Sequence, residues 1–154
     1  MSYAKVPTEN DNKITLLKTW VWVIYPFVGY NHVAVLIHRL LDVNNQRMTI
    51  LAQFDPPETV GFIRRALSFI RAIRGVVRAP MTNNYTYPHG FITVLSFPLQ
   101  GLNFLTNSVQ YDEQTFSQYA VGCNDCRDFA QAVIRVYGEG AENLDVRKEV
   151  FNLA

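Results

Sequence analysis

Apolar residues in the first hundred positions of this chain fall into runs of strand length. The run from Ile14 to Pro26 is rich in β-branched and aromatic residues, and similar runs cover residues 32–41 and 47–54. Short segments rich in Gly and Asn separate them, as is typical of tight turns between antiparallel strands. The pattern therefore predicts a three-stranded antiparallel meander.

The remainder of the chain alternates between helical and strand patterns. Apolar positions spaced i, i+3, i+4 and i+7 predict helices over residues 58–74 and 125–137, and residues 142–151 form a third, shorter candidate. Residues 91–97 predict another strand, which ends at a proline. We therefore expect an α+β fold in which an antiparallel sheet of four or more strands packs against helices.

Length and composition favour one globular domain. The chain has 154 residues, of which 49% are hydrophobic, enough for a substantial core. Residues 1–13 are polar and predict a flexible N-terminal lead-in, whereas residues 14–154 predict the single domain.

Charge and cysteine content narrow the functional classes. The formal net charge of +1 gives no reason to expect a nucleic-acid partner. The longest apolar stretch, residues 19–30, is too short for a transmembrane anchor. Two cysteines only three positions apart cannot staple distant segments, and the polar start does not resemble a signal peptide. These features favour a cytoplasmic location.

Three arginines recur every seven residues, at Arg64, Arg71 and Arg78. If the predicted helix continued through them, they would share one face, away from its apolar stripe. Such a row is usually a solvated surface, and the alternative is a docking surface for an anionic protein partner.

A candidate nucleophile lies where the helix at residues 125–137 begins. Cys126 follows a polar cap, and the unpaired amides of a helix start favour a thiolate. His32, at the start of a predicted strand, is the candidate base, and we expect its ring within about 4 Å of the sulfur. Hairpin parity places Gln53 and Asp55 on the same sheet face as His32, so either could orient the imidazole, with Asp55 favoured for its charge.

Two sequence segments, Asn31-His-Val-Ala-Val35 and Asn124-Asp-Cys-Arg-Asp-Phe-Ala130, resemble a known family. They are similar to the His strand and the Asn-Cys helix start of the circularly permuted branch of the NlpC-like papain-fold superfamily. That branch includes lecithin retinol acyltransferase-like proteins and PPPDE-type isopeptidases. The chain departs from the usual Asn-Cys pair because Asp125 intervenes, and no clear second histidine follows the His strand.

The resemblance implies a permuted papain-like fold and a thiol hydrolase or acyltransferase without a cofactor or metal. Cys126 would be the nucleophile and His32 the general base, and the reaction would pass through a thioester. Asn124 and Asp125 would support the helix start or the oxyanion. Substrates implied by the family are peptides, isopeptide-linked proteins and lipid esters.

Four other interpretations remain open. Cys126 is also compatible with a small buried core residue, and the domain with a non-catalytic interaction module on the same fold. Cys123 and Cys126 form a C-x-x-C segment, which is formally compatible with a thiol–disulfide oxidoreductase or half of a zinc site. Neither of these two functions has further ligands or an early-strand position to support it.

Overall fold

A computed structural model describes residues 3–5, 12–41, 46–57, 62–83, 86–100 and 109–152. Its main element is a six-stranded antiparallel sheet. The sheet order is β6-β4-β3-β2-β9, and β7 also pairs with β4. The bounds are β2 Lys13–Ile24, β3 Val28–Leu41, β4 Gln46–Asp55, β6 Val76–Arg78, β7 Met81–Thr82 and β9 Ile92–Pro98. The predicted α+β class and antiparallel sheet are thereby confirmed.

Strands β2, β3 and β4 form the predicted meander, and their register confirms the predicted parity. His38 pairs with Thr49 and Val35 with Ala52, so even positions of β3 lie opposite odd positions of β4. Side chains alternate between the two faces of a sheet. The even-numbered side chains of β3 and the odd-numbered ones of β4 therefore share one face.

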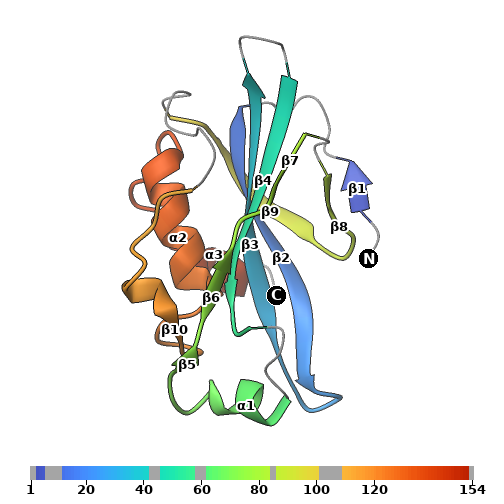
Figure 1. Cartoon of the computed structure of the whole chain (residues 1–154), viewed down its shortest axis with the longest axis vertical. Helices are drawn as coiled ribbons and strands as arrows, with labels where there is room; N and C mark the ends of the chain where they lie inside the picture. The colour runs from blue at the N-terminus through green and yellow to red at the C-terminus, as the bar shows by residue number, and fades with distance from the viewer. Residues whose placement is uncertain are drawn as a thin grey trace.

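Two helices cover the other face of the sheet (Figure 1). They are α2, Cys126–Tyr137, and α3, Val146–Asn152, close to the predicted ranges. The main hydrophobic core lies between them and the sheet and includes Val33, Phe54 and Phe129. Within the described ranges, no helix is both long enough and apolar enough to cross a bilayer.

A smaller cluster occupies the uncovered face. Leu17, Ala34, Leu36 and Leu51 are buried there, and Phe91 packs against them. Odd positions of β2 and even positions of β3 supply the first three, in agreement with the pairing of Leu17 with Ala34. The sheet therefore has apolar side chains on both faces, and α2 and α3 both lie on the face of the main core.

The helix predicted over residues 58–74 is much shorter. Helix α1 spans Phe62–Leu67, and residues 58–61 lie outside the described part of the chain. Successive amides after α1 bond to carbonyls three residues back, beginning with Ser68 to Arg65 at 3.1 Å. The Ser68 hydroxyl also bonds to the Arg65 carbonyl, at 2.6 Å. This tightening ends the helix before the rest of the expected range.

Further short strands replace the expected helix and part of the lead-in. β5, Ile73–Arg74, pairs with β10, Gln118–Tyr119, which follows the 3₁₀ turn η2 at Thr115–Ser117. Residues 3–5 of the expected lead-in form β1, Tyr3–Lys5, which pairs with β8, Thr86–Pro88. Each of these pairings joins segments distant in sequence, which a local pattern does not encode.

Candidate functional site

Asp125 caps the N-terminus of α2. Its side chain accepts hydrogen bonds from the amides of Arg127, at 3.0 Å, and Gly122, at 2.8 Å. The Asp128 side chain accepts the Asp125 amide at 2.8 Å, which completes a capping box. Asp125 therefore supports the helix start, as predicted.

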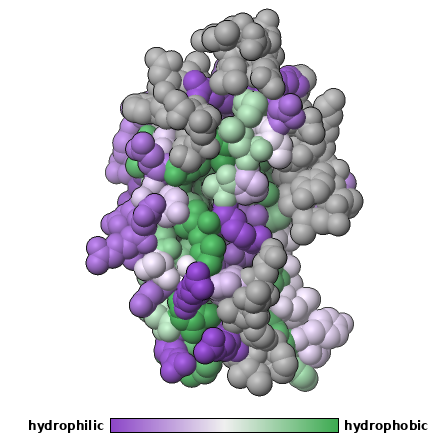
Figure 2. All heavy atoms as spheres, viewed as in Figure 1, coloured by the Kyte–Doolittle hydropathy of each residue, from purple (hydrophilic) through white to green (hydrophobic). Residues whose placement is uncertain are grey.

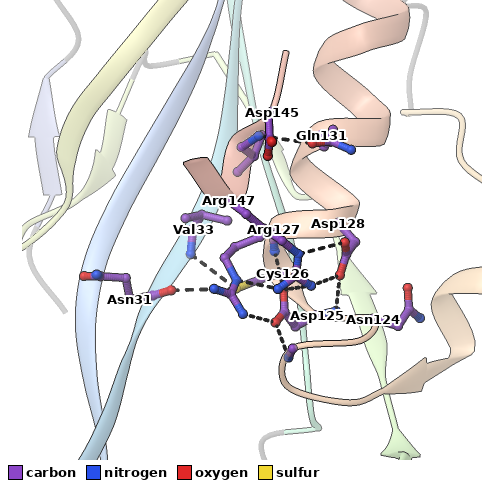
Figure 3. Close-up of polar contacts among 12 residues, drawn as sticks. Asn31, Val33, Asn124, Asp125, Cys126, Arg127, Asp128, Gln131, Asp145 and Arg147 are labelled. Carbon is purple, nitrogen blue, oxygen red and sulfur yellow. Dashed lines mark hydrogen bonds and ion pairs between the residues drawn. The ribbon is translucent and has the colours of Figure 1, made fainter. Parts of the chain in front are cut away.

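Two arginines surround this cap (Figure 3). Arg127 binds Asp125 at 2.6 Å, and Arg147 of α3 binds Asp128 at 2.6 Å and lies 3.5 Å from Asp125. Burial acts to raise the pKa of Asp125, but hydrogen bonds from Arg127 and Gly122 outweigh it and hold that pKa below its ordinary value. The carboxylate therefore stays ionised beside the thiol.

Cys126 lies against the edge of β3. Its sulfur accepts a hydrogen bond from the Val33 amide at 3.5 Å and lies 4.0 Å from the Asn31 carbonyl oxygen (Figure 3). The residue is 1% exposed. Burial, followed by the negative charge of Asp125, raises the pKa of the Cys126 thiol to about 12. The expected thiolate is therefore a neutral thiol here, because burial outweighs the favourable helix start.

His32 is held by Gln53. Its Nε2 atom lies 2.8 Å from Gln53 Oε1, and an amide oxygen only accepts, so Nε2 carries the hydrogen. Nδ1 is then the basic nitrogen, and it is buried without a hydrogen-bond partner among the residues that the structure describes. Burial, opposed by the Gln53 hydrogen bond, lowers the pKa of His32. This tautomer is the one that can take a proton at Nδ1.

The Cys126 thiol lies near the backbone of His32 but does not contact its imidazole ring. Asn31 and Val33, which contact the sulfur, flank His32, so Sγ lies within about 6 Å of the His32 Cα by covalent geometry. Yet Val33 belongs to the core under α2, whereas the His32 ring packs 6.2 Å from Phe91 on the other face. No hydrogen bond joins the two groups, so the expected direct pair is not formed.

Two other predicted site residues have different roles. Asp55, favoured as the orienting group, instead pairs with Arg78 at 2.9 Å, and Gln53 takes the orienting position. The Asn124 amide donates to the carbonyls of Thr115, at 2.7 Å, and Gln118, at 2.8 Å. Asn124 therefore braces the loop before α2 and is not placed to hold an oxyanion.

A cavity of about 230 Å³ lies beside Cys126. Its lining includes Tyr30, Asn31, Cys126, Arg127 and Phe151. Burial, followed by the nearby Cys126, raises the pKa of Tyr30 to about 12, so its hydroxyl remains a donor. Sequence reasoning missed Tyr30, which directly precedes one of the two segments that carry the family resemblance, and Arg127, which lies within the other.

The predicted arginine row is split between elements. Arg64 lies on α1, Arg71 follows that helix, and Arg78 lies on β6, where it pairs with Asp55. The seven-residue spacing places them on one face only if the helix continues, and it ends at Leu67. The prediction of a single helical arginine face is therefore wrong.

The C-x-x-C segment contains two different thiols. Cys123 is exposed, Cys126 is buried, and both are free. Among the described residues, no three His, Cys, Asp or Glu side chains gather into a group that could hold a metal ion. The segment thus contains neither a disulfide nor a described set of ligands for zinc.

Comparisons of this chain with family models, curated proteins and solved structures find no match. The resemblance to the NlpC-like superfamily therefore stays a prediction that rests on two short sequence segments. The candidate site has to be judged by its own geometry.

Proposed function

We propose that this protein is a cysteine-dependent hydrolase or acyltransferase with a permuted papain-like fold, acting on an amide, isopeptide or ester in the cytoplasm. The observation that carries the proposal is the state of His32. Gln53 holds the Nε2 atom of His32, and the buried Nδ1 atom has no hydrogen-bond partner in the described part of the chain. Cys126 contacts Asn31 and Val33, the two residues that flank His32. A buried nitrogen without a hydrogen-bond partner lowers the stability of a fold, and a catalytic role is one recognised reason for such a group.

The reaction would follow the usual course of a thiol nucleophile. Cys126 Sγ forms a bond to the substrate carbonyl carbon as its proton passes to His32 Nδ1. The tetrahedral intermediate then collapses, and the leaving amine or alcohol departs with that proton. Water or another acceptor then attacks the thioester carbonyl carbon and gives its proton to His32 Nδ1. The carbon–sulfur bond breaks, the acyl group leaves on the acceptor, and the proton returns from His32 to Cys126 Sγ.

The cavity supplies groups that fit this chemistry. The Cys126 amide has no acceptor among the described residues, as expected for the first residue of a helix. Its N–H group is therefore a free donor for an oxyanion at the start of α2. The Tyr30 hydroxyl and the Arg127 side chain line the same cavity and could bind a substrate oxygen. Proton transfer additionally requires the His32 side chain to turn toward the β3 edge.

Alkylation of the native protein tests the proposal. We expect iodoacetamide at neutral pH to modify Cys126 faster than exposed Cys123, as measured by peptide mass spectrometry over time. His32→Asn should slow the modification of Cys126 at least tenfold, because the base is removed. Cys123 is the internal control, and its rate should not change.

The opposite result would contradict the enzyme proposal. If Cys126 reacts only after denaturation, and His32→Asn has no effect on its native rate, the thiol is a core residue. A fold check by circular dichroism accompanies each variant, so that a changed rate can be separated from unfolding.

The burial of the thiol favours a second candidate function, a non-catalytic interaction module. A sulfur at 1% exposure with a raised pKa, hydrogen-bonded to a strand amide, is typical of a structural cysteine. On this alternative, Cys126→Ala would leave the protein's binding properties intact and change only its stability.

A further inference from the structure

The β2–β3 hairpin extends beyond the rest of the sheet. Strand β9 pairs with β2 only over Lys13–Lys18, and β4 pairs with β3 only from Val35 onward. Residues 19–24 of β2 therefore have β3 as their only strand partner among the described residues. In Figure 1 this hairpin end reaches the same lower end of the molecule as α1.

Large apolar side chains cover the projecting part of the hairpin. Tyr25 is 76% and Phe27 84% exposed, and Trp20, Trp22 and Ile24 are between 39% and 50% exposed. Trp22 lies between its aromatic neighbours, with ring centroids 5.5 Å from Trp20 and 5.2 Å from Tyr25. An exposed aromatic group of this size on a protrusion indicates a contact surface.

Three arginines surround a cavity at the same end. It has a volume of about 260 Å³, and Arg64, Arg71 and Arg74 line it together with Leu67 and Ile73. Their side chains form no ion pair with any described residue. Three guanidinium groups around one hollow, none of them paired with a carboxylate of the described residues, suit a phosphate or carboxylate group.

The hairpin and the arginine cavity are adjacent. Tyr30, which pairs with Val21 in the projecting part of the hairpin, packs edge-on against Phe69, which follows α1, with ring centroids 6.2 Å apart. At this lower end of the molecule, strongly hydrophilic surface lies directly beside hydrophobic surface (Figure 2). The sequence carries no Asp or Glu over residues 14–41 or 59–111, and Asp55 is already paired with Arg78.

We propose that this end of the molecule docks on an anionic phospholipid bilayer. The tip of the hairpin enters the interfacial layer, and the arginine cavity binds the headgroup of an anionic lipid. Trp and Tyr favour the membrane–water interface, and cationic side chains gain affinity from anionic lipids. This function is separate from the thiol chemistry and does not depend on it.

The shape of the surface favours a bilayer over a protein. The most exposed apolar side chains of the hairpin, Tyr25 and Phe27, are in the turn between β2 and β3, and the tryptophans lie behind them along β2. A convex apolar tip with a positively charged flank matches the layered order of acyl chains and headgroups. A protein interface of standard size instead needs a broad, closely complementary patch.

Intrinsic fluorescence gives a direct test, because the only two tryptophans of the chain, Trp20 and Trp22, lie on this hairpin. We expect vesicles of phosphatidylcholine with phosphatidylserine to shift the emission to the blue and brominated acyl chains to quench it. Vesicles of phosphatidylcholine alone should bind much more weakly, and added salt should weaken the binding further.

Two double variants and matched controls locate the contact. Tyr25→Ser with Phe27→Ser should lower vesicle affinity at least tenfold, because both apolar side chains are removed. Arg71→Ala with Arg74→Ala should lower it about thirtyfold on the anionic vesicles. Val136→Ser and Lys148→Ala, at exposed positions on α2 and α3, are the controls and should bind as the unchanged protein does.

Three results would overturn the proposal. They are vesicle binding without quenching, affinity that is indifferent to phosphatidylserine, and affinity unchanged in both double variants. Self-association that the hairpin variant abolishes, with no vesicle binding, would assign the surface to a second copy of the chain. Capture of a protein partner through the same residues, again without vesicle binding, would assign it to that protein.

Discussion

The His32 side chain combines burial with a single hydrogen bond. It is 5% exposed, and burial is the main reason that its pKa lies below the ordinary value of 6.5. The folded protein therefore holds His32 neutral under conditions in which the unfolded chain binds a proton. Stability contributed by this group is fully present above about pH 6.5 and decreases as the pH falls through the folded pKa.

The pH dependence of unfolding tests this assignment. We expect the free energy of unfolding to decrease below pH 6.5, with a contribution from His32 of up to about 1.4 kcal/mol per pH unit. His32→Asn should remove that contribution and flatten the profile, as measured by urea denaturation at a series of pH values. His89→Asn, at an exposed position, is the control and should keep the original slope. Equal slopes in all three proteins would contradict the assignment.

The start of α2 is stabilised by its own cap. Asp125→Ala removes the acceptor for the Arg127 and Gly122 amides and the ion pair with Arg127. We expect a loss of about 1–2 kcal/mol in the free energy of unfolding, measured by denaturation at neutral pH. Asp125→Asn keeps a capping oxygen and should lose less, whereas Glu139→Ala, which is exposed, should be nearly neutral. An Ala variant as stable as the Asn variant would show that the cap contributes little.

The sequence predicted correctly those elements whose apolar residues follow either the strand spacing or the helix spacing, but not both. The meander follows from strand-length apolar runs, and α2 follows from a polar cap at Asp125 before a helical apolar stripe. Residues 70–78 mix Arg with Ile, Val, Ala and Gly, and their apolar positions are compatible with both the helical and the strand spacing. Their short strands form because Ile73 pairs with Tyr119 and Val77 with Phe54, contacts that local sequence does not specify.

In the candidate site, too, local features were predictable from the sequence and long-range packing was not. Strand parity correctly placed Gln53 on the face of His32, because the alternation of a sheet is exact. The position of Cys126 at a helix start was also predictable. Whether that helix start meets the face or the edge of β3 depends on how α2 packs over the core, and this decides that the sulfur contacts the Val33 amide and not the imidazole.

At the scale of the whole molecule, one aromatic cluster connects the sheet to the segments that follow it. The ring of Phe54, on β4, lies 5.3 Å from Phe116, 5.1 Å from Tyr119 and 6.1 Å from Phe129, measured between centroids. These partners belong to η2, β10 and α2. Phe54 is fully buried, so its ring joins β4, the segment before α2 and α2 itself in one core.

Removal of this ring should therefore affect the whole molecule. We expect Phe54→Ala to lower the free energy of unfolding by about 3–5 kcal/mol, because it loses buried apolar area and leaves a cavity among three elements. Phe151→Ala is the matched control: that side chain is 80% exposed, and its loss should change stability by less than about 0.5 kcal/mol. Urea denaturation followed by both far- and near-ultraviolet circular dichroism measures the effect. Because Phe54 connects the sheet to α2, the two signals should shift together in the variant. A shift in the near-ultraviolet signal alone would show instead that the cluster stabilises only its immediate surroundings.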